Sequence, residues 1–525
     1  MTDTRDGDTE HERLRYHYDR HAPDYRDRFT DITKELHGKC PVAWTDTYDG
    51  HWVVSGHQEV FDIARRADIL SSDHDPKGER RGYQGVTIPC SSPNRNGFIE
   101  MDPPEQRQYR QSLNPYLSPA AVVRWKPFVD ELVRAVIDEK IETGSIDFVD
   151  DLANIVPAVL TLAMMGLPLA DWEVYCEPTH ALVYTPADSP ERQHVFEMVM
   201  DVVVRLYAAV AESRANQKPG LIDALIHASI NGTAPSDEDV TGALILLIGG
   251  GFDTTTALTA HSLEWLGDNP SERERLSRER DTLLDSATEE FLRYFTPAPG
   301  NGRTISADCE IDGVKFAEGE RLWLSWAMAN RDPKVFPDPD AVNLARTGNR
   351  HSSFGLGVHR CIGSNMARMT FKSMLTAVLD RMPGYVIDPS RTEHYETIGV
   401  IQGMRHLSAS FTPGRRLGPG LAETLAVLQR ACDEQRLAEP VTTHRQQARI
   451  ETAADLAVTA GQLQHRRQPG AKGLAADGAR PNAWPDRRGQ ARRFRVTVPR
   501  AWHRRRRRRP WPGRAARTSA PCRWG

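Results

Sequence analysis

The sequence predicts a mainly α-helical protein with a small β-rich lobe. Apolar residues recur at helical spacing over many long segments, whereas strand-like alternation is confined to short pieces. One predicted helix, Ser236–Gly267, would be roughly 50 Å long at about 1.5 Å per residue, enough to cross a whole domain. No internal repeat occurs at the 20–50-residue periods of solenoids. We therefore expect a large helical body with few strands.

The predicted elements follow from these patterns in chain order. Ser236 with Asp239 forms a capping box that starts the long helix. The predicted helices are Gln58–Leu70, Pro104–Leu117, Pro119–Glu142, Asn154–Met165, Arg192–Arg214, Leu221–Ile230, Ser236–Gly267, Ser286–Tyr294 and Cys361–Arg381. The predicted strands are Trp52–Ser55, Asp308–Phe316, Arg321–Trp326 and His406–Phe411.

The 525 residues divide by charge into two kinds of sequence. Residues 466–525 carry +17, and because the whole chain carries −4, residues 1–465 carry −21. The basic part lacks Ile, Met, Tyr and Glu, so it has little with which to build a core. It suits either an anion-binding tail or, as we favour, a disordered extension that resembles GC-rich DNA translated in a non-native frame. The expected regions are a polar segment 1–15, a body 16–415, an extension 416–465 with one helix at Leu421–Arg436, and the tail 466–525.

Targeting signals and disulfide patterns are missing from the sequence. The first thirty residues are polar and charged, and no run of eighteen apolar residues occurs, so we expect neither a signal peptide nor a membrane anchor. Seven cysteines are scattered without CxxC spacing, which predicts reduced thiols and a cytoplasmic protein. We expect no specific nucleic-acid partner.

Residues 354–363 carry the most informative pattern in the chain. They place one thiol in a glycine-rich turn directly before a predicted helix, whose free N–H groups favour a thiolate. Such a sulfur suits an axial ligand to iron, whereas the alternative is a buried cysteine in an ordinary loop. The fixed positions are Phe354, Gly355, Gly357, His359, Cys361 and Gly363.

This F-G-x-G-x-H-x-C-x-G string resembles, residue for residue, the haem-binding loop of the cytochrome P-450 family of haem-thiolate monooxygenases. Its motifs are most similar to the camphor monooxygenase type of bacterial members. The resemblance implies a P-450 fold with haem b between the Ser236 helix and the Cys361 helix, and Cys361 as the axial thiolate of the iron. It also implies one catalytic unit over about residues 15–415, where length alone predicts two or three domains.

A run of three glycines interrupts the predicted long helix at residues 249–251. Each glycine costs about 1 kcal/mol of helix stability, so the run requires either a close helix crossing or a local opening beside a ligand. The following residues complete G-G-x-D-T, which resembles the oxygen-activation motif of the family. That resemblance implies that Asp253 controls proton delivery and that the Thr254 hydroxyl hydrogen-bonds to the oxygen being activated.

A second helical pattern joins Glu290 to Arg293 on one helix face. Such pairs are usually solvated, but here they resemble the E-x-x-R motif of the family. The resemblance implies a buried structural pair, completed by Arg346, that supports folding and haem retention.

Four side chains resemble the groups that hold the haem propionates in the family. Arginine is the best donor for a carboxylate in a pocket without water. For Arg110 and Arg303 the alternative is an ordinary surface arginine. The four are Gln106 and Arg110 in the D-P-P-E segment, Arg303 and His359.

An apolar set of residues suits a hydrophobic small-molecule substrate. The loop at residues 83–99 differs from that of the camphor enzyme, which makes camphor itself a doubtful substrate. The predicted pocket residues are Leu246, Gly249, Pro299, Gly300, Val400 and Ile401.

The predicted function is that of a monooxygenase that hydroxylates or epoxidises its substrate with O2 and two external electrons. No iron–sulfur or dinucleotide motif occurs in the chain, so a separate ferredoxin and an NAD(P)H ferredoxin reductase are expected. Arg107 and Arg360 are the candidate contacts for that ferredoxin. The alternatives are a peroxide-driven peroxygenase and a haem-thiolate sensor or electron carrier without turnover.

Overall fold

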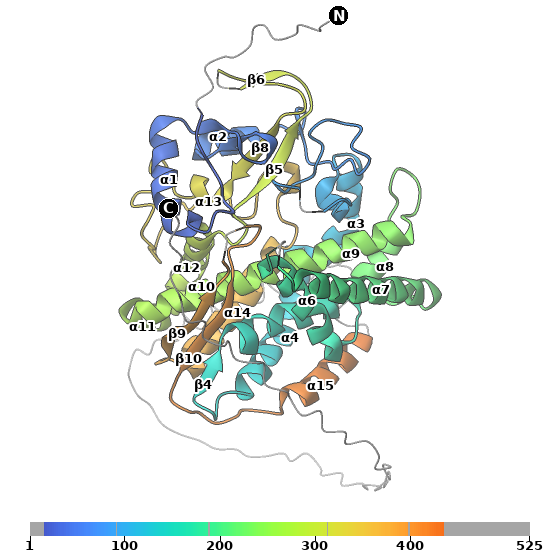
Figure 1. The fold of residues 1–525 in the computed structure, drawn as a ribbon. Coiled ribbons are helices and arrows are strands. Elements are labelled where there is room, and N and C mark those ends of the chain that lie inside the picture. The colour runs from blue at the N-terminus through green and yellow to red at the C-terminus, as the bar shows by residue number, and fades with distance from the viewer. Residues whose placement is uncertain (1–14, 91, 187–188, 312, 397–398, 435–525) are drawn as a thin grey trace, which may run out of the picture. The chain divides into compact units, whose positions relative to one another are not determined.

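The computed structural model describes residues 15–434 except 91, 187–188, 312 and 397–398, and these all belong to one unit that runs to Thr452. Helices make up most of this unit, and short strands form small sheets beside them (Figure 1). The predicted mainly α fold with a β-rich lobe is thereby confirmed. The predicted tail 466–525 lies outside the described residues.

The helices occur along the whole described chain. Eleven are at or near predicted positions; four others, α1, α6, α11 and α13, were not predicted. The α-helices are α1 (Tyr25–Lys39), α2 (His57–Ile63), α3 (Glu105–Leu117), α4 (Pro119–Asp138), α5 (Ile155–Met165), α6 (Trp172–Tyr184), α7 (Arg192–Ala215), α8 (Leu221–Ile226), α9 (Asp237–Gly251), α10 (Asp253–Asp268), α11 (Pro270–Arg278), α12 (Arg280–Phe295), α13 (Trp326–Ala329), α14 (Ser364–Arg381) and α15 (Leu421–Asp433). Short 3-10 or π turns are η1 (Thr47–Asp49), η2 (Gly97–Glu100), η3 (Val149–Ala153), η4 (Leu169–Asp171) and η5 (Gly357–His359).

The predicted long helix consists of two consecutive helices, α9 and α10. The capping box is present, because the Ser236 hydroxyl accepts from the Asp239 N–H and the Asp239 carboxylate accepts from the Ser236 N–H. The break falls at Phe252, whose φ of −83° and ψ of −76° depart from helical values, directly after the glycine run. This interruption matches one of the two alternatives, a local opening. A close helix crossing is also present, because a Cβ on Gly251 would lie 3.0 Å from Thr161 Oγ1 of α5.

The strands form three sheets. The largest has the order β1-β2-β8-β5-β3, in which β2 and β8 are parallel and the other neighbours antiparallel. A three-stranded antiparallel sheet, β4-β10-β9, packs near η3, and β6 and β7 form a hairpin. The strands are β1 (Val42–Thr45), β2 (His51–Val54), β3 (Leu70–Ser71), β4 (Ser145–Asp147), β5 (Gly300–Ile305), β6 (Cys309–Ile311), β7 (Val314–Phe316), β8 (Arg321–Ser325), β9 (Val386–His394) and β10 (Met404–Ser410).

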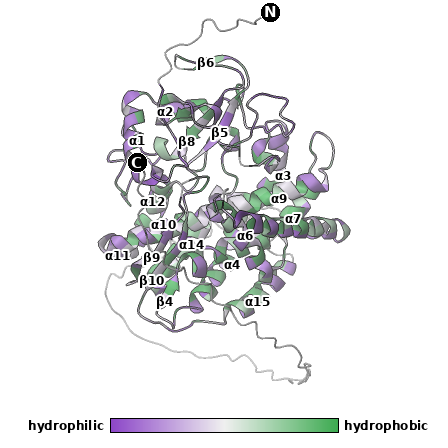
Figure 2. Ribbon diagram, in the orientation of Figure 1, coloured by the Kyte–Doolittle hydropathy of each residue, from purple (hydrophilic) through white to green (hydrophobic). Residues whose placement is uncertain are grey.

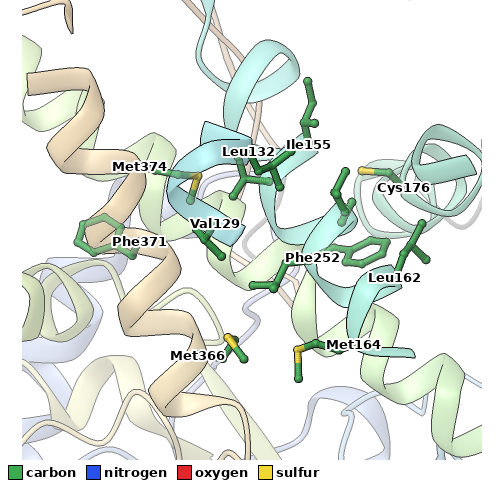
Figure 3. Packing of buried hydrophobic residues seen from close by; sticks show 14 of the residues in the cluster. Val129, Leu132, Ile155, Leu162, Met164, Cys176, Phe252, Met366, Phe371 and Met374 are labelled. Atoms are coloured by element: carbon green, nitrogen blue, oxygen red, sulfur yellow. The ribbon is translucent and has the colours of Figure 1, made fainter. Parts of the chain in front are cut away.

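The main hydrophobic core lies among α4, α5, α10 and α14. Figure 3 shows Leu132 of α4, Ile155 of α5 and Met374 of α14 close to one another, and all three are buried. Helices that pack on the core carry both hydrophobic (green) and hydrophilic (purple) residues in Figure 2. Helix α11 is almost wholly hydrophilic (purple). Burial of this many apolar side chains is the main source of stability of the helical body.

The stretch Asp237–Asp268 is the one helical segment of the described chain that is long and apolar enough to cross a membrane. Its best window has a mean hydropathy of 1.4, and 61% of that window is buried inside the protein. The same composition is typical of a core helix, and α9 and α10 contact helices on several sides.

Candidate active site

The loop before α14 is a tight turn folded back on α2. Gly355 and Gly357 both have φ of +66°, and a Cβ on Gly357 would lie 2.6 Å from the Ala64 carbonyl oxygen. The Cys361 N–H donates to the Phe354 carbonyl over 2.7 Å, which closes the turn. Only glycine combines this backbone conformation with such a close approach. The spacing of the motif is therefore required by the turn that presents the thiol.

Cys361 is exposed although protein surrounds it closely enough for burial to raise the pKa of its thiol. Cys361 thus keeps accessible surface on which a bound group can lie. The Gly363 N–H and the charges of Arg110 and Arg360 lower that pKa, yet burial outweighs them. Burial thus outweighs the stabilisation that the start of α14 offers to a thiolate, and an iron ion bound to the sulfur would favour the thiolate further.

A cationic cluster lies beside this thiol. Arg303 is 5% exposed and burial lowers its pKa to about 10, while burial together with Arg303 and Arg110 lowers the pKa of His359 to about 2. Arg110 Nη2 donates to the Arg360 carbonyl over 2.6 Å, and Arg303 Nη1 to the Gly302 carbonyl over 2.6 Å. Arg303 has Asp102 and Arg321 as charged neighbours, and the half-buried Arg110 has Arg360, so both guanidinium groups can bind a further anion.

These residues fit a haem, because the thiol suits the iron and the cationic cluster suits two propionate carboxylates. Cys361 would hold the metal, and Arg110, Arg303 and His359 would hold the carboxylates. The Gln106 side-chain amide donates to the Val358 carbonyl over 2.8 Å, and the residue is 1% exposed. It therefore braces the cysteine loop from α3. The contact of Gln106 with a propionate stays a prediction.

The E-x-x-R pair is fully buried. Arg293 donates to both oxygens of Glu290, each over 2.8 Å, and Arg346 Nε donates to the same carboxylate over 2.9 Å. The remaining Arg293 donors reach the carbonyls of Asn330, Pro339 and Ala341. Burial raises the pKa of Glu290, but its hydrogen bonds and charged partners lower it overall. The network ties α12 to the segment 330–346.

Asp253, at the start of α10, is enclosed by two groups that sequence reasoning missed. His180 Nδ1 of α6 contacts Asp253 Oδ1, and the Tyr395 hydroxyl donates to the same oxygen over 3.3 Å. The other carboxylate oxygen and His180 Nε2 are buried without a partner in the described part of the chain. Burial lowers the pKa of His180, but Asp253 raises it well above its ordinary value overall. No local motif identifies either partner, because 73 and 142 residues separate them from Asp253.

Thr254 lies next to this enclosed acid and is half-buried. Its hydroxyl donates to the Gly250 carbonyl of α9 over 2.9 Å, across the break between the helices. That hydroxyl keeps lone pairs with which it can accept a further hydrogen bond.

The predicted pocket residues do not share one environment. Leu246 and Gly249 are half-buried on α9, and Ile401 is 8% exposed, whereas Val400 is 45% exposed. Pro299 is buried. Gly300 is turned toward its own sheet, because a Cβ there would lie 2.5 Å from both the Leu324 carbonyl oxygen and the Trp323 ring.

An open groove of about 1250 Å³ lies elsewhere, between α15, η4, α6 and α7. None of the predicted site residues lines it. The residues around Cys361, and not those of this groove, form the candidate active site.

The fold and the cysteine loop together define a haem-thiolate protein. The model of the family described as cytochrome P450 matches residues 170–383. The chain is 31% identical over 351 residues to a vitamin D3 dihydroxylase of Streptomyces griseolus, covering 65% of this chain and 84% of that one. It is 30% identical over 393 residues to a linalool 8-monooxygenase of Pseudomonas putida, covering 73% and 95%.

Solved structures agree with these relatives. A mutant of P450 EryK bound to erythromycin B has a TM-score of 0.66 at 28% identity and covers 76% of this chain and 99% of its own. CYP109E1 from Bacillus megaterium with testosterone has a TM-score of 0.65 at 26% identity and covers 74% and 100%.

The chain belongs to the cytochrome P450 family, and its relatives are bacterial. It is an oxidoreductase of the monooxygenase type, and its cofactor is haem b. The predicted family, enzyme class and cofactor are thus confirmed, whereas the particular similarity to the camphor type stays a prediction.

Proposed function

We propose that this enzyme inserts one oxygen atom from O2 into a C–H bond or a double bond of a hydrophobic small molecule, with electrons from a separate ferredoxin and its NAD(P)H-dependent reductase. The observation that supports this reaction is the combination of the Cys361 loop with the acid and alcohol Asp253 and Thr254. The loop leads into α14, and α14 packs against α10. When bound, the haem supplies the iron that activates O2.

The polar side chains of the chain hold and move protons in this proposal. His180, whose pKa Asp253 raises, holds a proton beside Asp253 Oδ1, and the Tyr395 hydroxyl donates to the same oxygen. The other Asp253 oxygen, which has no partner in the described part of the chain, can accept a proton and pass it on. The Thr254 hydroxyl accepts a hydrogen bond as it stands, and it donates one to a bound ligand by turning away from the Gly250 carbonyl. A reaction driven directly by hydrogen peroxide needs no such acid–alcohol pair, so we favour O2 and external electrons.

The apolar character of Leu246 and Ile401 supports a hydrophobic substrate. The relatives' names include vitamin D3, linalool and a steroid as compounds acted upon, and all three are largely hydrocarbon. We accordingly propose a terpenoid or steroid-like substrate class. The six described cysteines outside the tail are free thiols, in agreement with the proposed cytoplasmic location.

A panel of terpenoids, steroids, fatty acids and aromatic compounds tests the proposal. We expect a terpenoid or steroid to shift the Soret band of the haem-loaded protein. The same compound should yield an oxygenated product with a surrogate ferredoxin, its reductase and NAD(P)H. Product formation only with added hydrogen peroxide would indicate a peroxygenase. Soret shifts without product under either condition would indicate a sensor.

A further inference from the structure

Two histidines and one glutamate converge at the boundary between α10 and β9, away from the cysteine loop. His261 and Glu264 lie three residues apart on one face of α10, and His394 is the last residue of β9. One ligand atom from each lies within 4.8 Å of the other two. We propose that these three side chains form a binding site for Zn²⁺.

The tautomer of His261 is the first argument. Its Nε2 lies 3.2 Å from the Gln402 carbonyl oxygen, which can only accept, so this nitrogen carries the proton. Nδ1 of the neutral ring is then a lone pair, and it faces a carboxylate oxygen of Glu264 at 3.5 Å. Two acceptors that face each other favour a cation between them, although Glu264 also has His394 Nε2 at 3.1 Å.

A second proton on His261 is disfavoured by its surroundings. The ring is 4% exposed and stacks on Phe295 and on His394, with ring centroids 5.4 Å and 5.6 Å away. A charged imidazolium enclosed by these rings would be desolvated. A divalent cation coordinated by Nδ1 satisfies the lone pair without charging the ring.

The third ligand completes a plausible coordination geometry. His394 Nε2 lies 3.1 Å from the Glu264 carboxylate. Ligand bonds of about 2.0–2.2 Å in a tetrahedron place neighbouring ligand atoms about 3.4 Å apart, close to the 3.1 and 3.5 Å observed. The Gln402 carbonyl orients His261 from behind, as an outer partner does at a zinc-binding histidine.

Access and ligand type favour zinc among the common divalent ions. The side chains of Glu264 and His394 are 23% and 35% exposed, so an ion and a water in the fourth position can reach the site from solvent. Two imidazoles with one carboxylate suit Zn²⁺, whereas Mg²⁺ and Ca²⁺ prefer oxygen ligands. The bound ion would join the end of β9 to α10.

A second histidine–carboxylate group in the chain shows the contrast and supplies a control. His406 Nδ1 lies 3.1 Å from Asp147 and 3.2 Å from Asp150, and these carboxylates raise its pKa to about 10. The proton on Nδ1 of His406 lies between the Asp147 and Asp150 carboxylates and provides the hydrogen bond that they accept. No ion is needed there, although its ligand atoms also lie within 4.8 Å of one another.

Zinc binding is measured on the full-length, haem-loaded protein after removal of any purification tag and of metals by a chelator. Equilibrium dialysis against Zn²⁺, with zinc and haem counted by elemental analysis, should show one saturable equivalent. Glu264→Gln and His394→Gln should each weaken it by about tenfold or more. His406→Gln should bind zinc as the unaltered protein does.

Thermal unfolding gives a second measurement of zinc binding, besides the ratio of zinc to haem. Free Zn²⁺ at 100 times Kd should raise Tm by about 2–4 °C in the unaltered protein and in His406→Gln only. The reduced carbon-monoxide band of each variant confirms that it is folded and loaded with haem. Undiminished zinc binding in Glu264→Gln and His394→Gln, or no saturable binding in the unaltered protein, would overturn the proposal.

Discussion

Replacement of Arg293 by lysine tests the structural role of the buried E-x-x-R pair. The Arg293 guanidinium makes two hydrogen bonds to Glu290 and one to each of the carbonyls of Asn330, Pro339 and Ala341, at 2.8–2.9 Å. Lysine keeps the charge but loses the planar fork, so it can satisfy only some of these acceptors at once. The lost contacts are at the centre of the protein, where Glu290 and Arg293 are both 0% exposed.

The expected cost follows from the burial of this pair. Removal of one partner of a buried ion pair costs about 3–5 kcal/mol, and this range is an upper bound here because lysine keeps the charge and loses only part of the hydrogen bonds. An unfolding entropy of about 2.1 cal/mol/K per residue over the roughly 420 described residues converts this cost into a fall in Tm of about 3–6 °C. Because the carboxylate of Glu290 keeps Arg346, we expect the lower part of this range.

Arg275 supplies the matched control for this measurement. It pairs with Glu272 at the same i,i+3 spacing over 3.1 Å, but its side chain is 35% exposed. Arg275→Lys should change stability by less than about 1 kcal/mol, as is usual for exposed pairs. Thermal unfolding followed by circular dichroism and by Soret absorbance measures both variants. Equal Tm values for the Arg293 and Arg275 variants would refute the reasoning.

Three further predictions concern the haem, the protons and the redox partner. Cys361→Ser should abolish the red-shifted Soret band of the reduced carbon-monoxide complex, and a variant that keeps the band would show that another group ligates the iron. Thr254→Ala should leave substrate-induced Soret shifts intact, but electrons from NAD(P)H should then reduce O2 to hydrogen peroxide in place of forming product. Asp253→Asn should slow turnover. An unchanged product yield per NAD(P)H in Thr254→Ala would contradict this division of roles. Arg360→Glu should reduce ferredoxin-supported turnover and its salt dependence, because this exposed charge opposes the −21 of residues 1–465; full activity across ionic strength would place the docking face elsewhere.

Helices with a clear apolar stripe were predictable because their pattern is local. The bounds of α3 and α5 differ from the prediction by one residue at their first position. The predicted Gln58–Leu70 helix is too long, since α2 ends at Ile63 and Leu70 belongs to β3. Five strands were missed, β1, β3, β4, β5 and β9, and the predicted piece Asp308–Phe316 is the hairpin of β6 and β7. Strand β9 is largely exposed or half-exposed on both faces, so it lacks the alternation by which a half-buried strand is found.

The sequence by itself determined the features whose partners lie within a few residues. The turn that presents Cys361, the capping box at Ser236 and the spacing of Glu290 and Arg293 all follow from local backbone geometry, so residue order suffices to predict them. Family resemblance added the haem, because the same string of residues recurs with it.

The tertiary structure alone decided which distant side chains meet. In the folded protein His180 and Tyr395 contact Asp253. The Gln106 amide donates to the Val358 carbonyl, and His394 contacts Glu264, 130 residues away in the sequence. These contacts depend on how α6, α10 and β9 pack, and packing is set by the sum of many weak apolar contacts over the whole core. No short sequence motif predicts the total packing energy, so contacts between residues far apart in the sequence can be identified only from the tertiary structure.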